Sequence, residues 1–450
     1  MTEYATEKRS FMTWLQESVT LKLCFIGLLI LILLIPSSLV QNLINERATR
    51  QDEIIKDVSD KWSSDQLIQG PVLMIPYKKH VKYLDNNNNE AEKDVIDNLY
   101  VLPDNLHIKA DLKTQILHRG IFDVVVYNSI IKISGNFGKT NLNALNLLPA
   151  QLLPDKAKLM FSISDLKGLK TNPIVKAAGQ QAQAEPTFNE HTAFKNGLQA
   201  SVDLSATKDN NIPFDYVLDL KGSQELSFLH LGKTTDVEAK GNWANPSFDG
   251  RYLPDTRTVD NTGFSARWKM LYYNRPYPQQ WVGDDTLLSN VKKQQDATFG
   301  IKLRVPVDQY QKTTRTSKYS LLIITLTFIS LFLTEVIRRQ KVHVFNYILI
   351  GAAMIIYYSL LLSFSEQIGF NYAYLVASVS TVTLITIFIA SLIKNRNAAL
   401  LFGFILSVFY TFIFVIIQLE DLALIFGSIA LFVIVAALMY FSRKINWDKH

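Results

Sequence analysis

Hydrophobic and polar positions divide the chain into three stretches. One apolar run stands near the N-terminus, a long polar stretch follows, and further apolar runs fill the C-terminal part. A helix needs about 20 mostly apolar residues to cross the hydrocarbon core of a bilayer. The pattern therefore predicts transmembrane helices at 21–41, 319–337, 345–364, 372–393, 399–417 and 422–441.

The first apolar run, LCFIGLLILILLIPSSLV (23–40), follows the basic residues Lys8, Arg9 and Lys22. A secretory signal also has a basic flank and an apolar body, but its apolar region is shorter and ends in small residues at an A-x-A-like site. This run is long, and residues 38–40 offer no such site. It predicts an uncleaved signal anchor.

Lysine and arginine in short loops indicate how the helices are oriented, because these residues stay on the cytoplasmic side. Basic residues follow alternate helices, at Arg338, Arg339, Lys341, Lys394, Arg396, Arg443, Lys444 and Lys449. The remaining loops carry Glu366, Glu420 and Asp421. We therefore expect residues 1–20 and 442–450 in the cytoplasm and residues 42–318 on the outer, periplasmic side.

The polar stretch begins with a helical pattern and then changes period. Ile54, Ile55, Val58 and Trp62 recur at helical spacing between charges, which predicts an amphipathic stalk that continues the first helix. A period of two follows, rich in β-branched and aromatic residues. It is typical of strands and hairpins, at 121–137, 214–231 with a turn at Gly222, 235–243 and 264–271.

These elements predict a large β-rich domain, a sandwich or a strongly twisted sheet, inserted between the first and second of six membrane helices. The segment DNNNNEAEK (85–93) predicts a surface loop. Residues 172–191 read as a polar connection that could divide the domain into two β-rich halves. One domain and two domains remain open alternatives.

Composition and charge narrow the function classes. The chain is 48% hydrophobic, and its net charge is +6. Much of the basic excess lies at the ends of predicted helices, with no stripe of lysines between aromatics, so we expect no nucleic-acid partner. The single cysteine, Cys24, starts the first helix, so an apolar core and not a disulfide must stabilise the outer domain.

Motifs for catalysis and metal binding fail on spacing. Residues 135–140, GNFGKT, end like a phosphate-binding loop but have Ile133 where that loop needs its first glycine. Ser164 and Lys167 match the S-x-x-K of serine enzymes without the partner motifs S-D-N and K-T-G. The sequence has no G-x-S-x-G or H-E-x-x-H. We therefore predict no catalytic, cofactor or metal site, and a protein that is not an enzyme.

Charged and polar residues of the membrane block are candidates for other roles. Glu335 stands one turn before Arg338 and Arg339, which predicts a helical ion pair at the cytoplasmic edge, with a coupling carboxylate as the alternative. Glu366, Glu420 and Asp421 are predicted in outer loops, either solvated or in contact with the outer domain. The fourth helix is rich in hydroxyl residues, which favours helix packing over a substrate path: Ser378, Ser380, Thr381, Thr383 and Thr386.

The stretch WANPSFDGRYLP (243–254) combines turn dipeptides with aromatic residues. It predicts a connecting loop with an aromatic plug over a sheet end. A structural corner is one interpretation, and a partner-binding tip is the other, because loops on a rigid β scaffold often bind. The candidate interaction residues are Trp243, Pro246, Phe248 and Gly250.

The sequence resembles the CreD family, inner-membrane proteins of Gram-negative bacteria named for cell-envelope integrity. The resemblance is carried by segments along nearly the whole chain: LLIPSSLVQNLINERATRQDEII, QGPVLMIPY, LPDNLHIKADL, HRGIFDVVVYNSIIKISGNF, NWANPSFDGRYLPD, GFSARWKMLYYNRPYPQ, VDQYQKTTRTSKYSLLIITLTFISLFLTEV, SEQIGF and QLEDLALIFGSIALFVIVAALMY. The resemblance implies the same topology and a link to a two-component sensor system, to tolerance of envelope-directed agents and to the β-lactam response. It implies no catalytic residues.

Three functions follow from these observations. The first is a non-enzymatic envelope protein whose partners are the lipid bilayer and an unidentified envelope protein or ligand bound by the periplasmic domain. The second is a transporter or lipid-handling protein that uses the C-terminal helices. The third is a periplasmic hydrolase whose residues converge only in the fold.

Overall fold

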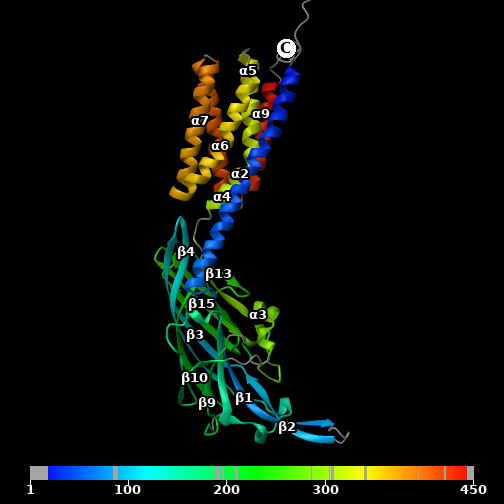
Figure 1. Cartoon of the computed structure of the whole chain (residues 1–450), viewed down its shortest axis with the longest axis vertical. Helices are drawn as coiled ribbons and strands as arrows, with labels where there is room; N and C mark the ends of the chain where they lie inside the picture. The colour runs from blue at the N-terminus through cyan, green and yellow to red at the C-terminus, as the bar shows by residue number, and fades with distance from the viewer. Residues whose placement is uncertain are drawn as a thin grey trace, which may run out of the picture. The chain divides into compact units, whose positions relative to one another are not determined.

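The computed structural model describes residues 19–84, 90–187, 193–194, 197–207, 211–284, 286–303, 305, 309–338, 342–393, 395–419 and 422–442. The chain forms two compact units, a helical unit (Met1–Asp52 with Val307–His450) and a β unit (Glu53–Pro306). Helix α2, Val19–Trp62, contributes to both units as one continuous helix of 44 residues (Figure 1). The predicted helical stalk that continues the first apolar run is therefore confirmed.

Among the described residues, the β unit contains a sheet of nine strands and a sheet of eight strands. The first has the order β13-β17-β11-β1-β5-β9-β8, with β2 paired to β1 and β16 to β2. Its strands are β1 Gln66–Leu84, β2 Glu90–Val101, β5 Ala157–Ile163, β8 Glu185–Pro186, β9 Gly197–Val202, β11 Glu225–Leu229, β13 Pro246–Gly250, β16 Gln280–Val282 and β17 Thr298–Leu303.

The eight-stranded sheet has the order β14-β15-β12-β3-β4-β10-β6-β7. Its strands are β3 Asn105–Arg119, β4 Phe122–Phe137, β6 Ile174–Ala177, β7 Gln180–Gln183, β10 Ile212–Ser223, β12 Thr234–Gly241, β14 Thr256–Asp260 and β15 Gly263–Leu271. Short 3-10 helices connect strands of the unit at Asn143–Leu145, Pro149–Gln151, Pro154–Lys156 and Leu166–Gly168.

The main core lies between the two sheets. Buried and exposed positions alternate along β3, as a strand with one face in a core requires. The rings of Trp268 from β15 and Phe299 from β17 meet across the sheets with centroids 5.6 Å apart. The β-rich domain predicted from period-two alternation is therefore a sandwich.

A second, smaller core covers the other face of the nine-stranded sheet. Residues of β16, of the 3-10 helix Leu287–Ser289 and of helix α3 (Val291–Ala297) build this cover, and a further 3-10 helix, Tyr272–Asn274, is exposed. Trp281 stacks on Tyr100 with ring centroids 5.3 Å apart. Both faces of the central strands are thus buried.

Three predicted features of the β unit need correction. Gly222 does not turn a hairpin, because β10 and β11 belong to different sheets and the chain passes between them at Gln224, whose φ is +52°. Residues 90–93 of the predicted surface loop begin β2, and residues 85–89 lie outside the described residues. The predicted polar connection at 172–191 holds the strands β6, β7 and β8, and strands from before and after it alternate in both sheets.

The helical unit contains α2 and the helices α4 Gln309–Lys318, α5 Ser320–Arg338, α6 Val344–Ile368, α7 Phe370–Ile393, α8 Arg396–Gln418 and α9 Ala423–Ser442. By length and apolar composition, α2, α6, α7 and α8 can each cross a membrane. The bent pair α4 and α5, which meet at 42°, adds a fifth span if the pair counts as one. The six predicted runs coincide with helices except at the turn residues Tyr319 and Leu422, but α4 extends the helical unit to residues that were expected in the β-rich domain.

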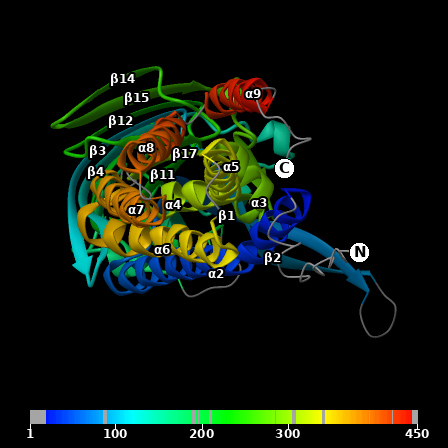
Figure 2. The same ribbon diagram turned by 90° about the horizontal axis from the view of Figure 1, so that it is seen from above.

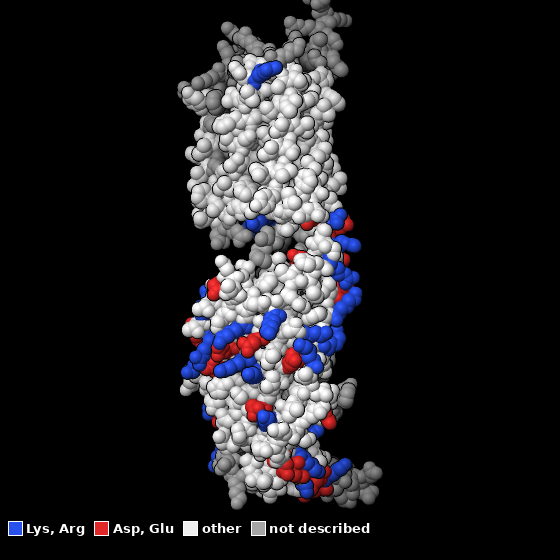
Figure 3. Space-filling model, turned by 90° about the vertical axis from the view of Figure 1, so that its left-hand side faces the viewer, with Lys and Arg blue, Asp and Glu red and all other residues white. Residues whose placement is uncertain are grey.

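Helix α7 packs between α6 and α8, as the end-on view shows (Figure 2). On the face in Figure 3, the helical unit presents a broad band without lysine, arginine, aspartate or glutamate, and charged residues lie at its ends. Such a band suits contact with lipid chains. The helical unit therefore has the surface of a membrane-embedded structure.

Candidate functional site

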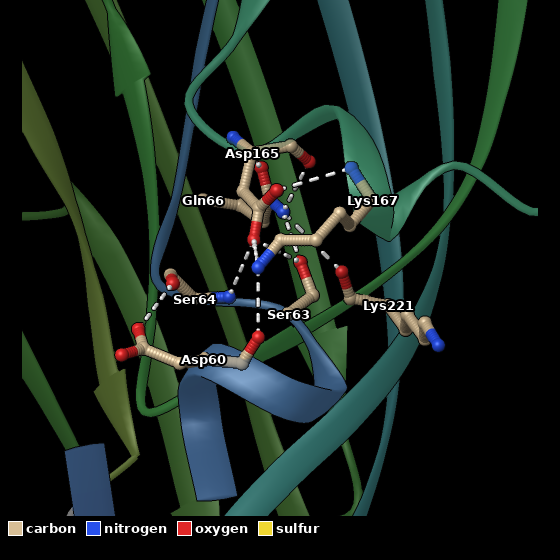
Figure 4. A network of polar contacts seen from close by, with 7 residues as sticks. All are labelled: Asp60, Ser63, Ser64, Gln66, Asp165, Lys167 and Lys221. Atoms are coloured by element: carbon tan, nitrogen blue, oxygen red, sulfur yellow. Dashed lines mark hydrogen bonds and ion pairs between the residues drawn. The ribbon is translucent and has the colours of Figure 1, made fainter. Parts of the chain in front are cut away.

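A network of polar contacts in the β unit surrounds Asp165, at the C-terminal end of α2 (Figure 4). The Asp165 carboxylate accepts hydrogen bonds from the backbone N–H of Ser64 at 3.1 Å and from that of Lys167 at 3.0 Å. Ser63 Oγ lies 3.4 Å from the same carboxylate. One side chain thereby connects the chain that leaves α2 with the 3-10 helix at 166–168.

Gln66 fills the interior of this network. Its Nε2 donates to Ser63 Oγ at 2.8 Å and to the Asp165 carbonyl at 3.1 Å. The Gly168 backbone packs so closely that a Cβ there would lie 2.6 Å from Gln66 Nε2 and 2.5 Å from the Lys221 carbonyl. Only glycine fits at this position without a shift of its neighbours.

The S-x-x-K pattern belongs to this network. Lys167 Nζ donates to the Asp60 carbonyl in the last turns of α2 at 2.7 Å and lies 3.6 Å from the Asp165 carboxylate. The Ser164 hydroxyl accepts from the Leu67 N–H at 2.6 Å. A cation at the C-terminal end of a helix interacts favourably with its dipole and its last carbonyls. The lysine therefore acts here as a helix cap.

Electrostatics keep the Asp165 carboxylate ionised. Burial alone would raise its pKa, but the N–H groups of Ser64 and Lys167 and the Lys167 ammonium outweigh burial and lower the pKa. The network accordingly favours a charged, fully hydrogen-bonded acceptor. That arrangement suits a permanent structural junction better than a group that exchanges protons near neutral pH.

The GNFGKT segment ends a strand. Strand β4 stops at Phe137, and a Cβ at Gly138 would lie 2.0 Å from Asp104 Oδ2. A carboxylate in that place repels phosphate. Among the described residues, no group of three or more His, Cys, Asp or Glu side chains is placed to hold a metal ion.

The stretch 243–254 differs from its prediction as a connecting loop, because Pro246–Gly250 form β13 and pair with β17. Phe248 is half-buried and packs edge-on against Trp268, with centroids 5.8 Å apart, and against Phe264. Trp243 donates its Nε1–H to the Asn245 carbonyl at 3.1 Å. Trp243 and Phe248 therefore pack, partly buried, against the main core at the edge of the nine-stranded sheet.

Gly250 ends β13 with φ of +99°, and a Cβ there would lie 2.4 Å from the Thr298 carbonyl. The neighbouring Asp249 forms an ion pair with Lys302. β13 is the last strand of its sheet, so its outer edge carries no further strand among the described residues. Whether this edge binds a partner stays a prediction.

Glu335 is held by groups that the sequence did not indicate. It forms an ion pair with Lys22 of α2, and the two side chains are 10% and 13% exposed. Tyr347 Oη donates to Glu335 Oε2 at 3.1 Å, and the Val342 N–H donates to Oε1 at 3.1 Å. The Arg338 side chain and Arg339 lie outside the described residues, so the predicted pair with them is untested.

Glu366 belongs to α6 and not to a loop, because that helix continues to Ile368. Tyr310 of α4 donates its hydroxyl to Glu366 Oε1 at 2.9 Å, and Arg47 Nε of α2 lies 4.0 Å from the same oxygen. Glu366 thus joins three helices of the helical unit. Glu420 and Asp421 lie outside the described residues.

The missed contacts share one cause. Lys22 and Glu335 are 313 positions apart in sequence, and Asp165 and Ser64 are 101 apart. Single-sequence patterns report neighbours within one helix or strand, so they give no signal for such pairs. For Lys22 and Glu335, the sequence hint was a charge near the end of an apolar run.

Comparison with known proteins covers both units. Residues 18–448 match the protein family described as "Inner membrane protein CreD". The inner membrane protein CreD of Escherichia coli (strain K12) is 26% identical over 419 residues, which are 93% of this chain and 91% of that protein. The resemblance stated from sequence segments is thereby confirmed.

Proposed function

The chain belongs to the CreD family of inner membrane proteins, and on that basis we propose that it contributes to cell-envelope integrity or the envelope-stress response. In this proposal the β unit binds an envelope component or a partner protein, and the helical unit anchors it. The observation that supports binding best is the outer edge of β13, which pairs with no further strand in the part of the chain that the structure describes.

An exposed strand edge can bind an extended segment of another protein by adding a strand. Unpaired edges also promote aggregation, and proteins guard them with proline and charge. β13 carries Pro246 at its start and the Asp249–Lys302 ion pair near its end. These guards leave Ser247 and Phe248 as the positions where a partner strand would pair.

Photo-crosslinking in living cells tests this edge. A photoreactive residue at Arg251, exposed directly after β13, is compared with one at Gln181 in β7, the opposite edge of the other sheet. The proposal expects a discrete protein adduct from position 251 alone. No adduct at 251, or the same adduct from both positions, would contradict binding at this edge.

We further propose six membrane spans with both termini in the cytoplasm and residues 42–318 in the periplasm. The charge-free band and the apolar helices support membrane crossing, and the basic residues near alternate helix ends support the orientation. In a Cys24→Ala background, Thr258→Cys in exposed β14 should react with a membrane-impermeant maleimide in intact spheroplasts. Labelling only after lysis would place the β unit in the cytoplasm.

Deletion of the gene tests the envelope role itself. The proposal expects altered sensitivity to envelope-directed agents, restored by the wild-type chain. An unchanged sensitivity under every inducing condition would contradict the proposal.

A transporter or lipid-handling protein is the second candidate function, and a hollow along α7 and α8 favours it.

A further inference from the structure

A hollow of about 670 Å³ lies along α7 and α8 in the helical unit. Its apolar lining includes Leu375, Val379 and Val382. Its polar lining consists of uncharged amide and hydroxyl side chains: Asn371, Tyr372, Tyr374, Ser378, Thr383, Ser407, Tyr410 and Thr411. A water-soluble ion or a strongly charged solute finds no counter-charge among these lining residues.

The hollow has the depth of one membrane leaflet. On α7 it extends from Asn371, at the start of the helix, to Thr383, and twelve residues of α-helix span about 18 Å. Half of a hydrocarbon core measures about 15 Å. On α8 it extends from Ser407 to Phe414, near the end of that helix. The hollow therefore begins near one end of this helix pair and extends along about half of α7.

A buried hydroxyl in the lining is left without a partner. Tyr410 is 2% exposed, and its Oη has no hydrogen-bond partner among the described residues. The Tyr410 carbonyl, by contrast, accepts from the Tyr374 hydroxyl at 2.6 Å. A buried hydroxyl without a hydrogen-bond partner is costly until an acceptor reaches it. A ligand of this hollow should therefore bring an oxygen acceptor.

The boundary end of the hollow leads to a cation. Asn371 Oδ1 accepts from Gln418 Nε2 at 2.7 Å, and Gln418 Oε1 accepts from Lys312 Nζ at 3.3 Å. The Lys312 ammonium also lies 5.8 Å from the centre of the Phe370 ring. One lysine is thus fixed two hydrogen bonds away from the lining of the hollow.

We propose that the hollow is a binding site for one glycerophospholipid. An acyl chain lies along Leu375, Val379 and Val382, an ester carbonyl accepts from the Tyr410 hydroxyl, and the phosphate lies near Lys312. A glycerophospholipid has an apolar body, uncharged oxygen acceptors and one negative charge in its headgroup. The site offers an apolar wall, a hydroxyl donor and a lysine in the same order. The site requires only that α7 and α8 span the membrane, so it stands apart from the proposed envelope role.

The test uses the full chain in nanodiscs with a phosphatidylglycerol that carries a diazirine on an acyl chain. Labelled peptides are then mapped by mass spectrometry. We expect label concentrated in 371–383 and 407–414. Equal label on exposed residues of α6, such as Ile348 and Ile356, would mean ordinary boundary lipid and would overturn the site.

A matched pair of variants sharpens this test. Ser407→Phe fills the hollow from an exposed position, and Ser391→Phe places the same side chain on an exposed position of α7 outside it. Ser407→Phe should reduce labelling roughly tenfold, and Ser391→Phe should leave it unchanged. Equal labelling of the two variants would contradict the proposal.

Two further variants separate the contacts and guard against misfolding. Tyr410→Phe keeps the volume and removes the hydroxyl, and it should speed exchange of the probe. Lys312→Gln should remove the advantage of phosphatidylglycerol over a competing diacylglycerol. A third variant, Ser407→Cys in a Cys24→Ala background, tests whether two chains form a disulfide at this position. If they do so efficiently, and neither Tyr410→Phe nor Lys312→Gln changes the labelling, the hollow is an interface between copies and the lipid site is wrong.

Discussion

A lysine and a carboxylate lie close together at each end of α2, but their surroundings differ. Toward its N-terminus, Lys22 and Glu335 are 13% and 10% exposed within the helical unit. Toward its C-terminus, Lys167, which contacts the Asp60 carbonyl, is 62% exposed, and Asp165 is 14% exposed. Water can therefore replace the lysine at the second end but not at the first.

This difference sets the energetic weight of the same chemical groups. Removing one member of a buried ion pair leaves an unpaired charge in a surrounding that cannot hydrate it. Removing an exposed member costs little more than one hydrogen bond, because solvent screens the remaining charge. We therefore expect the N-terminal end of α2 to be fixed by electrostatics and the C-terminal end by hydrogen-bond geometry.

The largest expected effect is the loss of Lys22. Lys22→Met should destabilise the helical unit by about 3–5 kcal/mol, because Glu335 stays buried without its cation. Hydrogen exchange of peptides from α2 and α5, measured on the full chain in detergent, reports this opening.

A double variant serves as the control for this pair. Lys22→Met with Glu335→Leu should recover most of the stability, since no charge is left unpaired. If Lys22→Met alone exchanged like the wild type, the pair would carry no weight and the contrast between the two ends would disappear.

Acid should act on the β unit through His230 and not through Asp165. His230 is fully buried, and burial lowers its pKa to about 4. The unfolded chain takes up this proton near pH 6.5, so the contribution of His230 to stability falls by roughly 3 kcal/mol as the pH drops from about 6.5 toward 4. The pKa of Asp165 is lowered, so its carboxylate stays charged over that range.

Unfolding of the full chain, followed by tryptophan fluorescence from buried Trp268, checks this pH dependence. The neutral ring accepts from Thr235 at Nδ1, 2.9 Å away, and donates to the Leu271 carbonyl from Nε2, 3.3 Å away. The His230→Gln variant should be less stable than the wild type at pH 7.5, and its stability should fall less than that of the wild type when the pH is lowered. A slope equal to that of the wild type would assign the acid sensitivity to another group.

Loss of the Asp165 carboxylate should have an intermediate effect. Asp165→Ala leaves the N–H groups of Ser64 and Lys167 without their acceptor, which should cost about 2 kcal/mol. Asp203→Ala is the control, because Asp203 caps Ser205 in an exposed turn. Faster exchange in the last turn of α2 should appear only in Asp165→Ala.

The two units also differ in how far their structure could be predicted. Apolar run length located α2 and α5 to α9, although it missed the polar helix α4, and alternation located β4, β12 and β15, because both signals are local. Sheet order was not predictable, since it depends on pairing between distant strands such as β1 and β11. Gly222 shows the limit: a turn-like glycine between two strands marks a passage between sheets instead of a hairpin.

The candidate residues follow the same rule. Phe248 was identified by its local aromatic pattern, although as a loop residue. Glu335 was identified by its charge near the end of an apolar run, but its partner Lys22 was not. Tyr410 gave no signal, because a tyrosine in an apolar helix is common and only the packed helices show that its hydroxyl has no partner among the described residues.

The smallest expected effect isolates the helix cap. Lys167→Met removes the hydrogen bond to the Asp60 carbonyl and the favourable charge at the end of α2, about 1 kcal/mol in total. Lys170→Met is its control, because Lys170 pairs with Asp219 at 3.4 Å on the surface and contacts no helix end in the described residues. Exchange of the Ser63 N–H, which donates to the Ser59 carbonyl, should quicken in Lys167→Met and stay constant in Lys170→Met. Equal exchange in both variants would mean that Asp165 alone fixes this end, and that the lysines at the two ends of α2 have nothing in common beyond their charge.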